Sequence, residues 1–146
     1  MTDAEIEAFI GSFEEGTLPR SEWTHQRHLV MALWYLRQHG REVAAGLIRD
    51  GIRRYNERQG NHTGYHETIT LAWIAVIDRF LSQKRPGTPV SALAAELLDE
   101  CGARDYLLRF YSRERLFSDE ARGRWLGPDL AEIEPIALAG SSRDSR

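Results

Sequence analysis

Apolar residues recur every three or four positions along most of this chain, and that spacing constrains its fold more than any other feature. The first run places Ile6, Phe9, Ile10 and Phe13 on one side of a segment that Thr2 can cap. Such a period is typical of an amphipathic helix that buries one face, and no strand pair is visible. The pattern predicts an all-α protein, an up-and-down helical bundle of four to five main helices with short C-terminal helices.

Glycine and proline residues separate the apolar runs and set the expected ends of the helices. Gly16, Gly40, Gly60 and Gly102 follow helical runs, and Pro86-Gly87 interrupts another. The expected main helices cover residues 2–16, 25–39, 41–58, 65–83 and 88–102, and shorter helices are expected over 105–111 and 118–126.

The third expected helix combines an apolar stripe with many charged residues. We expect Val43, Leu47, Ile48 and Ile52 to point inward and its arginine and glutamate side chains to face solvent.

The chain has 146 residues, which suits a single domain. We expect residues 1–126 to form one helical-bundle domain. Gly127-Pro128 breaks the helical pattern and the last six residues are polar, so residues 127–146 are expected to be an extended or partly disordered tail.

The composition excludes several classes of protein. A net charge of −3 argues against a nucleic-acid partner, because phosphate binding needs a basic surface. A single cysteine, Cys101, cannot form an internal disulfide. The N-terminal residues do not resemble a secretion signal and no apolar run approaches the roughly 18 residues of a membrane span, so we expect a cytoplasmic protein without a membrane partner.

Four of the five histidines form two short clusters, His25 with His28 and His62 with His66. Each cluster lies at the predicted start of a helix. Short connections should make consecutive helices antiparallel, so the second and fourth helices would start at the same end of the bundle. We therefore expect the four imidazoles to gather there.

Neutral imidazoles that converge in this way are suited to a divalent metal, zinc or another first-row transition metal. The hypothesis assigns His25, His28 and His66 as ligands and His62 as a fourth. Three histidines would leave a coordination position open for water, and Glu67 would act as base or orient a ligand. The remaining candidate pocket residues are Glu22, Tyr65, Thr70 and Trp73.

This interpretation predicts a small metal-dependent hydrolase that activates water. The alternative is a non-enzymatic module that binds a small molecule or another protein through a metal-free histidine–carboxylate pocket. In a third interpretation the histidines only stabilise the fold. A small-molecule ligand suits the first two, and the oligomeric state stays open between a monomer and a homodimer.

Two blocks resemble stretches of an uncharacterised family of small bacterial helical proteins. They are Trp23-Thr24-His25-Gln26-Arg27-His28-Leu29 and Tyr65-His66-Glu67-Thr68-Ile69-Thr70, and the likeness extends to residues 111–118. This resemblance implies no activity. The histidine number and the bundle architecture are also similar to DinB-like bundles, which hold a metal with three histidines, but the His-x-x-His pair opening one helix departs from their pattern.

Overall fold

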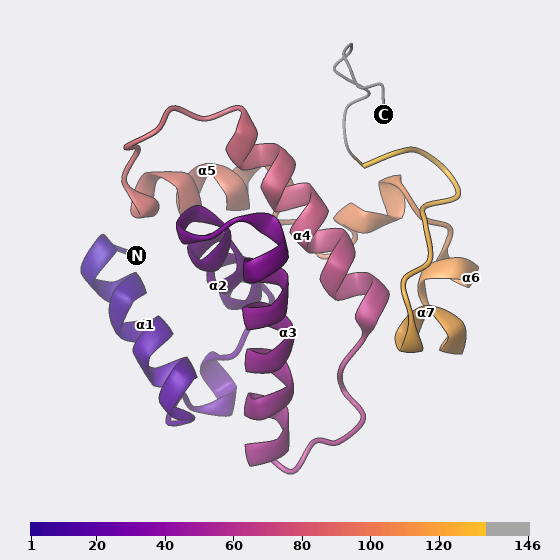
Figure 1. Ribbon diagram of the computed structural model, residues 1–146, viewed down its shortest axis with the longest axis horizontal. Helices are drawn as coiled ribbons and strands as arrows, with labels where there is room; N and C mark the ends of the chain where they lie inside the picture. Colours follow the sequence, from indigo (N-terminus) through magenta and orange to yellow (C-terminus); the bar gives the residue numbers. More distant parts are fainter. Residues whose placement is uncertain (134–146) are drawn as a thin grey trace.

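The structure is a computed structural model that describes residues 1–133 (Figure 1). Within that range it contains helices and no strand, so the all-α prediction is confirmed. Two 3₁₀ turns, Arg20–Glu22 and Tyr106–Arg109, join the helices. The helices are α1 (Asp3–Glu15), α2 (His25–Gln38), α3 (Arg41–Arg58), α4 (Glu67–Ser82), α5 (Val90–Cys101), α6 (Arg113–Leu116) and α7 (Asp119–Gly123).

The first helix begins and ends where the sequence predicts. The Thr2 hydroxyl accepts a hydrogen bond from the backbone N–H of Glu5, and the Glu5 carboxylate accepts one from the N–H of Thr2. Gly16 ends the helix with φ at 80°, a left-handed conformation that suits glycine. Local sequence is therefore sufficient to define α1.

The bundle is built around α2 and α4, which pack against each other. Helix α3 packs on both of them, and α5 lies crosswise beside α1 and α2 (Figure 1). Leu33 of α2, Ile77 of α4 and Leu97 of α5 are fully buried in the resulting core. None of the helices within residues 1–133 has the length and apolar character needed to span a lipid bilayer.

The prediction for the inward face of α3 was wrong at two positions. Val43 is 58% exposed and Leu47 is 39% exposed, whereas Ala44, Ile48 and Tyr55 are buried. With Gly51, the buried positions are still spaced three or four residues apart, so the helical period holds and only its phase differs. A small residue and an amphipathic tyrosine occupy positions that a hydrophobicity pattern does not assign to the core.

A close approach between α1 and α3 explains this phase. A Cβ atom added to Gly51 would lie 3.0 Å from the ring of Phe13, so this glycine lets the aromatic ring pack against the α3 backbone. One turn later the Tyr55 hydroxyl donates a 2.8 Å hydrogen bond to the carbonyl oxygen of Leu18. These tertiary contacts determine which face of α3 points toward the core.

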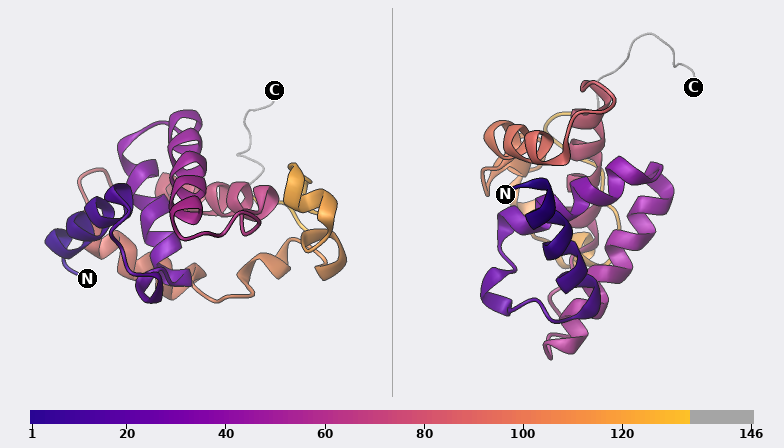
Figure 2. Two further views of the ribbon diagram at one scale, coloured as in Figure 1. Left: turned by 90° about the horizontal axis from the view of Figure 1, so that it is seen from below. Right: turned by 90° about the vertical axis from the view of Figure 1, so that its left-hand side faces the viewer.

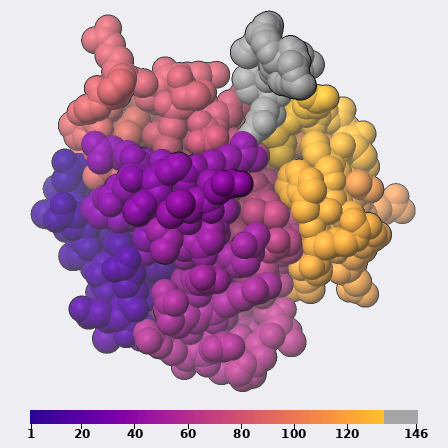
Figure 3. All heavy atoms as spheres, in the orientation of Figure 1, coloured from indigo at the N-terminus to yellow at the C-terminus, as the bar shows by residue number. Residues whose placement is uncertain are grey.

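Residues 102–133, called here the C-terminal segment, fold onto the side of the molecule opposite α1 (Figure 2). In the space-filling view this segment forms a lobe along α4 (Figure 3). The Thr68 hydroxyl donates to the carbonyl of Arg124 at 2.7 Å and accepts from the N–H of Leu126 at 3.0 Å. Near the end of the described chain Ile133 is buried and its carbonyl accepts from Arg79 at 2.6 Å. Hydrogen bonds thus join this segment to α4 at two places.

The structure describes only the first part of the predicted tail, which covers residues 127–146. Residues 127–133 contain no helix and contact the domain: the N–H of Leu130 donates to the carbonyl of Phe110 at 2.9 Å. Residues 134–146 of that prediction lie outside the described residues.

Replacing Leu33 by alanine should lower the free energy of unfolding by about 2–5 kcal/mol, because the change leaves a cavity in the core. Leu47→Ala, on the exposed side of α3, should cost less than about 1 kcal/mol. Urea unfolding followed by circular dichroism measures both values. Equal losses would contradict the described burial of these two leucines.

Candidate functional site

His25 is the first residue of α2, and its ring is partly buried between two other elements. Its Nε2 donates a 3.1 Å hydrogen bond to the carbonyl oxygen of Gly102, the residue that ends α5. The ring also meets Trp73 edge-on, with 5.6 Å between the ring centroids. Burial lowers the pKa of His25 below its ordinary value, although the bond to Gly102 opposes the shift.

His28 lies one turn later but joins a different cluster. Its ring stacks on Trp23 with 3.7 Å between centroids, and its Nδ1 donates to the carbonyl oxygen of Thr24 at 2.7 Å. Burial lowers the pKa of His28, so the neutral ring is favoured. Within residues 1–133 the buried indole nitrogen of Trp23 has no hydrogen-bond partner, which is unusual for a buried polar atom.

His66 caps α4, and both of its ring nitrogens are engaged. Nδ1 accepts a 3.1 Å hydrogen bond from the N–H of Ile69, and Nε2 donates a 2.9 Å bond to the carbonyl oxygen of Leu116. An acceptor at Nδ1 and a donor at Nε2 define one neutral tautomer. Burial is the main cause that lowers the pKa of His66, and the nearby Arg122 lowers it further.

The structure does not bring the three predicted metal ligands together. In the part of the chain that it describes, no group of three or more His, Cys, Asp or Glu side chains is placed to hold a metal ion. The reason is an offset along the helix axes: His25 is level with Trp73, which lies seven residues, about 10 Å, beyond His66 on α4. Metal binding itself stays a prediction.

Glu67, the predicted base, belongs to a polar network on α4. Arg49 of α3 donates to both of its carboxylate oxygens, at 3.2 and 3.0 Å, and the hydroxyl of Tyr65 donates to Oε1 at 2.5 Å. Burial by itself would raise the pKa of Glu67, but the hydrogen bonds from Arg49 and Tyr65 outweigh it and the pKa is lowered. A carboxylate held in this way is a weak proton acceptor.

The other predicted pocket residues are dispersed. Glu22 is exposed and pairs with Arg27 at 3.5 Å. The Thr70 hydroxyl donates to the carbonyl oxygen of His66 at 2.8 Å, and Trp73 stacks on Tyr106 with 5.8 Å between centroids. These side chains have structural partners and do not line one common pocket.

An open cleft of about 490 Å³ does contain two of the predicted residues, His62 and Tyr65. This volume falls within the range of small-molecule sites. The C-terminal half of α3 forms one wall, the loop between α3 and α4 a second, and α7 a third. Polar and charged side chains dominate the lining, among them Arg53, Asn56, Asn61 and Arg122.

The loop that carries His62 is ordered by local hydrogen bonds. Gly60 has φ at 77°, and the N–H of Asn61 donates to the carbonyl of Asn56 at 2.8 Å. The Asn61 side chain then accepts from the N–H of Thr63 at 3.3 Å. At Gly64 a Cβ atom would lie 2.2 Å from the Asn61 amide nitrogen, so glycine permits this side chain to fold over the loop.

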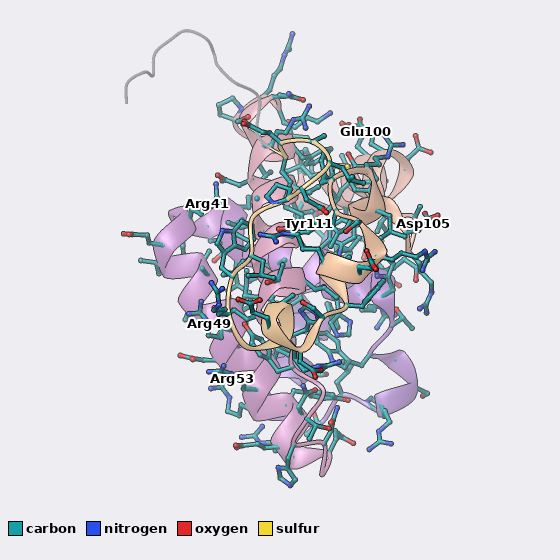
Figure 4. The ribbon with its side chains drawn as sticks, turned by 90° about the vertical axis from the view of Figure 1, so that its right-hand side faces the viewer. Arg41, Arg49, Arg53, Glu100, Asp105 and Tyr111 are labelled. Carbon is teal, nitrogen blue, oxygen red and sulfur yellow. The ribbon has the colours of Figure 1, made fainter. Side chains whose placement is uncertain are left out.

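Two arginines from distant parts of the sequence complete the cleft. Arg53 lies over the ring of Tyr65, with the guanidinium carbon 4.5 Å from the ring centroid. Nη1 of Arg122 on α7 donates to the carbonyl oxygens of Thr63 and Tyr65, at 3.0 and 3.4 Å. Figure 4 shows Arg49 and Arg53 following one another along α3 beside the C-terminal segment.

Neither Arg53 nor Arg122 was a predicted site residue. Each stands in a helix rich in charged residues, where a solvated arginine is the ordinary case, and no local spacing relates the two. Only the docking of the C-terminal segment places them around one cleft. The neighbouring Asn61-His62-Thr63-Gly64 turn was the available sequence signal, because asparagine and glycine favour ordered turns.

Comparisons with protein families, with curated protein sequences and with solved structures find no significant match. The resemblance of the two histidine blocks to a bacterial helical family therefore stays a prediction.

The free energy of unfolding should fall as the pH drops below about 6.5. Folding lowers the pKa values of His25, His28 and His66 from 6.5, so below that pH the unfolded chain binds more protons than the folded one. The stabilisation is complete above pH 6.5 and is lost as the pH falls toward the folded-state pKa values. Urea unfolding at pH 5–8 measures the dependence.

The variant His66→Asn tests how much His66 contributes to this pH dependence of the free energy of unfolding. Asparagine can still cap α4 but does not titrate, so the variant should show a weaker pH dependence and lose about 1–3 kcal/mol through the bond to Leu116. His39→Asn, at an exposed ring, is the matched control and should follow the wild type. An unchanged pH dependence in His66→Asn would exclude His66 as a contributor.

Proposed function

We propose that this protein is a non-enzymatic binding module whose cleft between α3, the 59–66 loop and α7 takes a small polar molecule. The observation that carries the proposal is the pre-organisation of the cleft. Arg53 is held on the Tyr65 ring and Arg122 on two loop carbonyls before any ligand arrives. Groups that are already oriented lose less entropy when a ligand binds.

The hydrogen bonds of Glu67 and His66 argue against catalysis by these predicted residues. Glu67 is paired with Arg49 and accepts from Tyr65, and its pKa is lowered. Both ring nitrogens of His66 serve the fold. General acid–base catalysis requires a group that can exchange a proton with the substrate, and neither residue is arranged to do so.

The metal-dependent hydrolase remains the competing hypothesis. For His66 to bind a metal, one ring nitrogen would have to give up its backbone partner, either Ile69 or Leu116. His25 would have to leave the carbonyl of Gly102 or coordinate through its other nitrogen. Because freeing a ring nitrogen of His66 breaks a hydrogen bond of the fold, the geometry favours the binding module.

Elemental analysis of untagged protein distinguishes the two functions. We expect less than about 0.1 equivalent of zinc or another transition metal after dialysis against zinc and then buffer, because three-nitrogen coordination needs converging rings. Metal near one equivalent that is lost in both His28→Ala and His66→Ala would support the hydrolase and overturn the binding module as the main function.

Gly123→Phe tests the cleft directly. Gly123 lines it and has no atom within 4 Å of an added Cβ, so the larger side chain should enter the cleft without a clash at its first atom. A panel of polar small molecules is first screened against wild-type protein by ligand-observed NMR. Any ligand whose amide shifts map to Tyr65 and Arg122 should bind Gly123→Phe at least about tenfold more weakly.

Gly127→Phe is the matched control. Gly127 lies four residues later, is equally open and does not line the cleft, so this variant should bind as the wild type does. Ligands that bind both variants equally, or that shift no amide of the cleft, would overturn the proposed function.

A further inference from the structure

Two arginines of the cleft have no salt bridge in the part of the chain that the structure describes, although Arg53 is close enough to Glu67 to help lower the pKa of that carboxyl. Within residues 1–133 neither Arg53 nor Arg122 forms a salt bridge, whereas Arg49, one turn before Arg53, is paired with Glu67 at 3.0 Å. Glu57 contributes one negative charge to the lining. The charged side chains of the lining, Arg53, Arg122 and Glu57, therefore carry one excess positive charge, although the whole chain has a net charge of −3.

Both guanidinium groups are oriented and still have N–H groups to offer. The guanidinium carbon of Arg53 lies 4.5 Å from the Tyr65 ring centroid, and within residues 1–133 none of the Arg53 N–H groups donates a hydrogen bond to the protein. The bonds of Arg122 to Thr63 and Tyr65 both use Nη1. A guanidinium has five N–H donors, so each arginine retains donors for a ligand.

Nearby acceptors in the protein are already engaged and compete less for the N–H groups of the two arginines. The Glu67 carboxylate already accepts hydrogen bonds from the Tyr65 hydroxyl and from Arg49. The amide side chains of Asn56 and Asn61 line the same cleft and can bind further ligand oxygens. Arginine forks match the planar oxygens of carboxylate and phosphate, and hydrogen bonds between charged partners are about twice as strong as neutral ones.

We infer that the ligand of this cleft carries an anionic oxygen group, a carboxylate or a phosphate, held between Arg53 of α3 and Arg122 of α7. This inference rests on the proposed function and names the class of molecule that the cleft binds. Arg53 and Arg122 belong to segments that meet only in the folded protein, so the anion would also join α7 to α3. Neutral sugars and cations offer no group of matching charge.

Four probes test the assignment on the full chain at constant ionic strength: sodium phosphate, sodium succinate, glucose and putrescine. Amide shifts in ¹H–¹⁵N spectra report binding at Thr63, Tyr65 and Gly123. We expect phosphate or succinate to shift these amides, and glucose and putrescine to leave them unchanged. Whichever anion binds more tightly identifies the source of the oxygen group.

Arg53→Gln and Arg122→Gln should each weaken anion binding at least about tenfold, and Arg53→Lys and Arg122→Lys should recover part of the loss because they restore the charge. Arg113→Gln, at an exposed arginine of α6 outside the cleft, is the control and should bind as the wild type does. Anion affinity should also fall as sodium chloride is raised from 20 to 200 mM, a test that needs no variant.

The possible outcomes separate the two proposals. If glucose or putrescine binds in the cleft and keeps its affinity in both Gln variants, the anion assignment is overturned and the binding module stands. Anion binding that Arg113→Gln weakens as much as the cleft variants do would also overturn the assignment. If no probe shifts a cleft amide and the wider panel yields no cleft ligand, both proposals fail.

Discussion

The attachment of the C-terminal segment to the start of α4 is the interaction on which the rest of the structure depends. His66 and Thr68 donate side-chain hydrogen bonds to the carbonyls of Leu116 and Arg124, partners that lie 50 and 56 residues later in the chain. These bonds satisfy buried backbone groups that would otherwise cost free energy. They also determine where α7 lies, and α7 supplies one wall of the cleft.

That attachment explains why the cleft contains two arginines and not the predicted group of histidines. A histidine whose two nitrogens serve a helix cap and a distant carbonyl contributes to stability and has no free lone pair for a ligand. Arg122 is brought against the 59–66 loop by the same docking. The structural role of His66 and the placement of Arg122 in the cleft are thus two results of one packing arrangement.

The helices could be predicted from the sequence because their signals are local. Thr2 with Glu5 defines the start of α1, and the bounds of α3 agree with prediction at both ends. Helix α4 begins two residues later than expected, since His66 takes the cap position. Only His62 and Tyr65 of the cleft were predicted from the sequence, because no local sequence pattern distinguishes the arginines beside them from ordinary surface arginines.

Sequence alone determined the all-α class, the bounds of α3 and the cap of α1, since each depends on residues within a few positions of one another. The short C-terminal helices were predicted less well: the helix expected over 105–111 is a 3₁₀ turn, the one expected over 118–126 is the shorter α7, and α6 was not predicted. Tertiary structure decided which face of α3 is buried, that His25 is level with Trp73 and not with His66, and that Arg53 and Arg122 line one cleft. The physical reason is that the spacing of apolar residues shows which face of a helix is apolar but not which element packs against that face. The rotation and axial offset of each helix come from contacts such as Phe13 on Gly51 and Thr68 on Arg124.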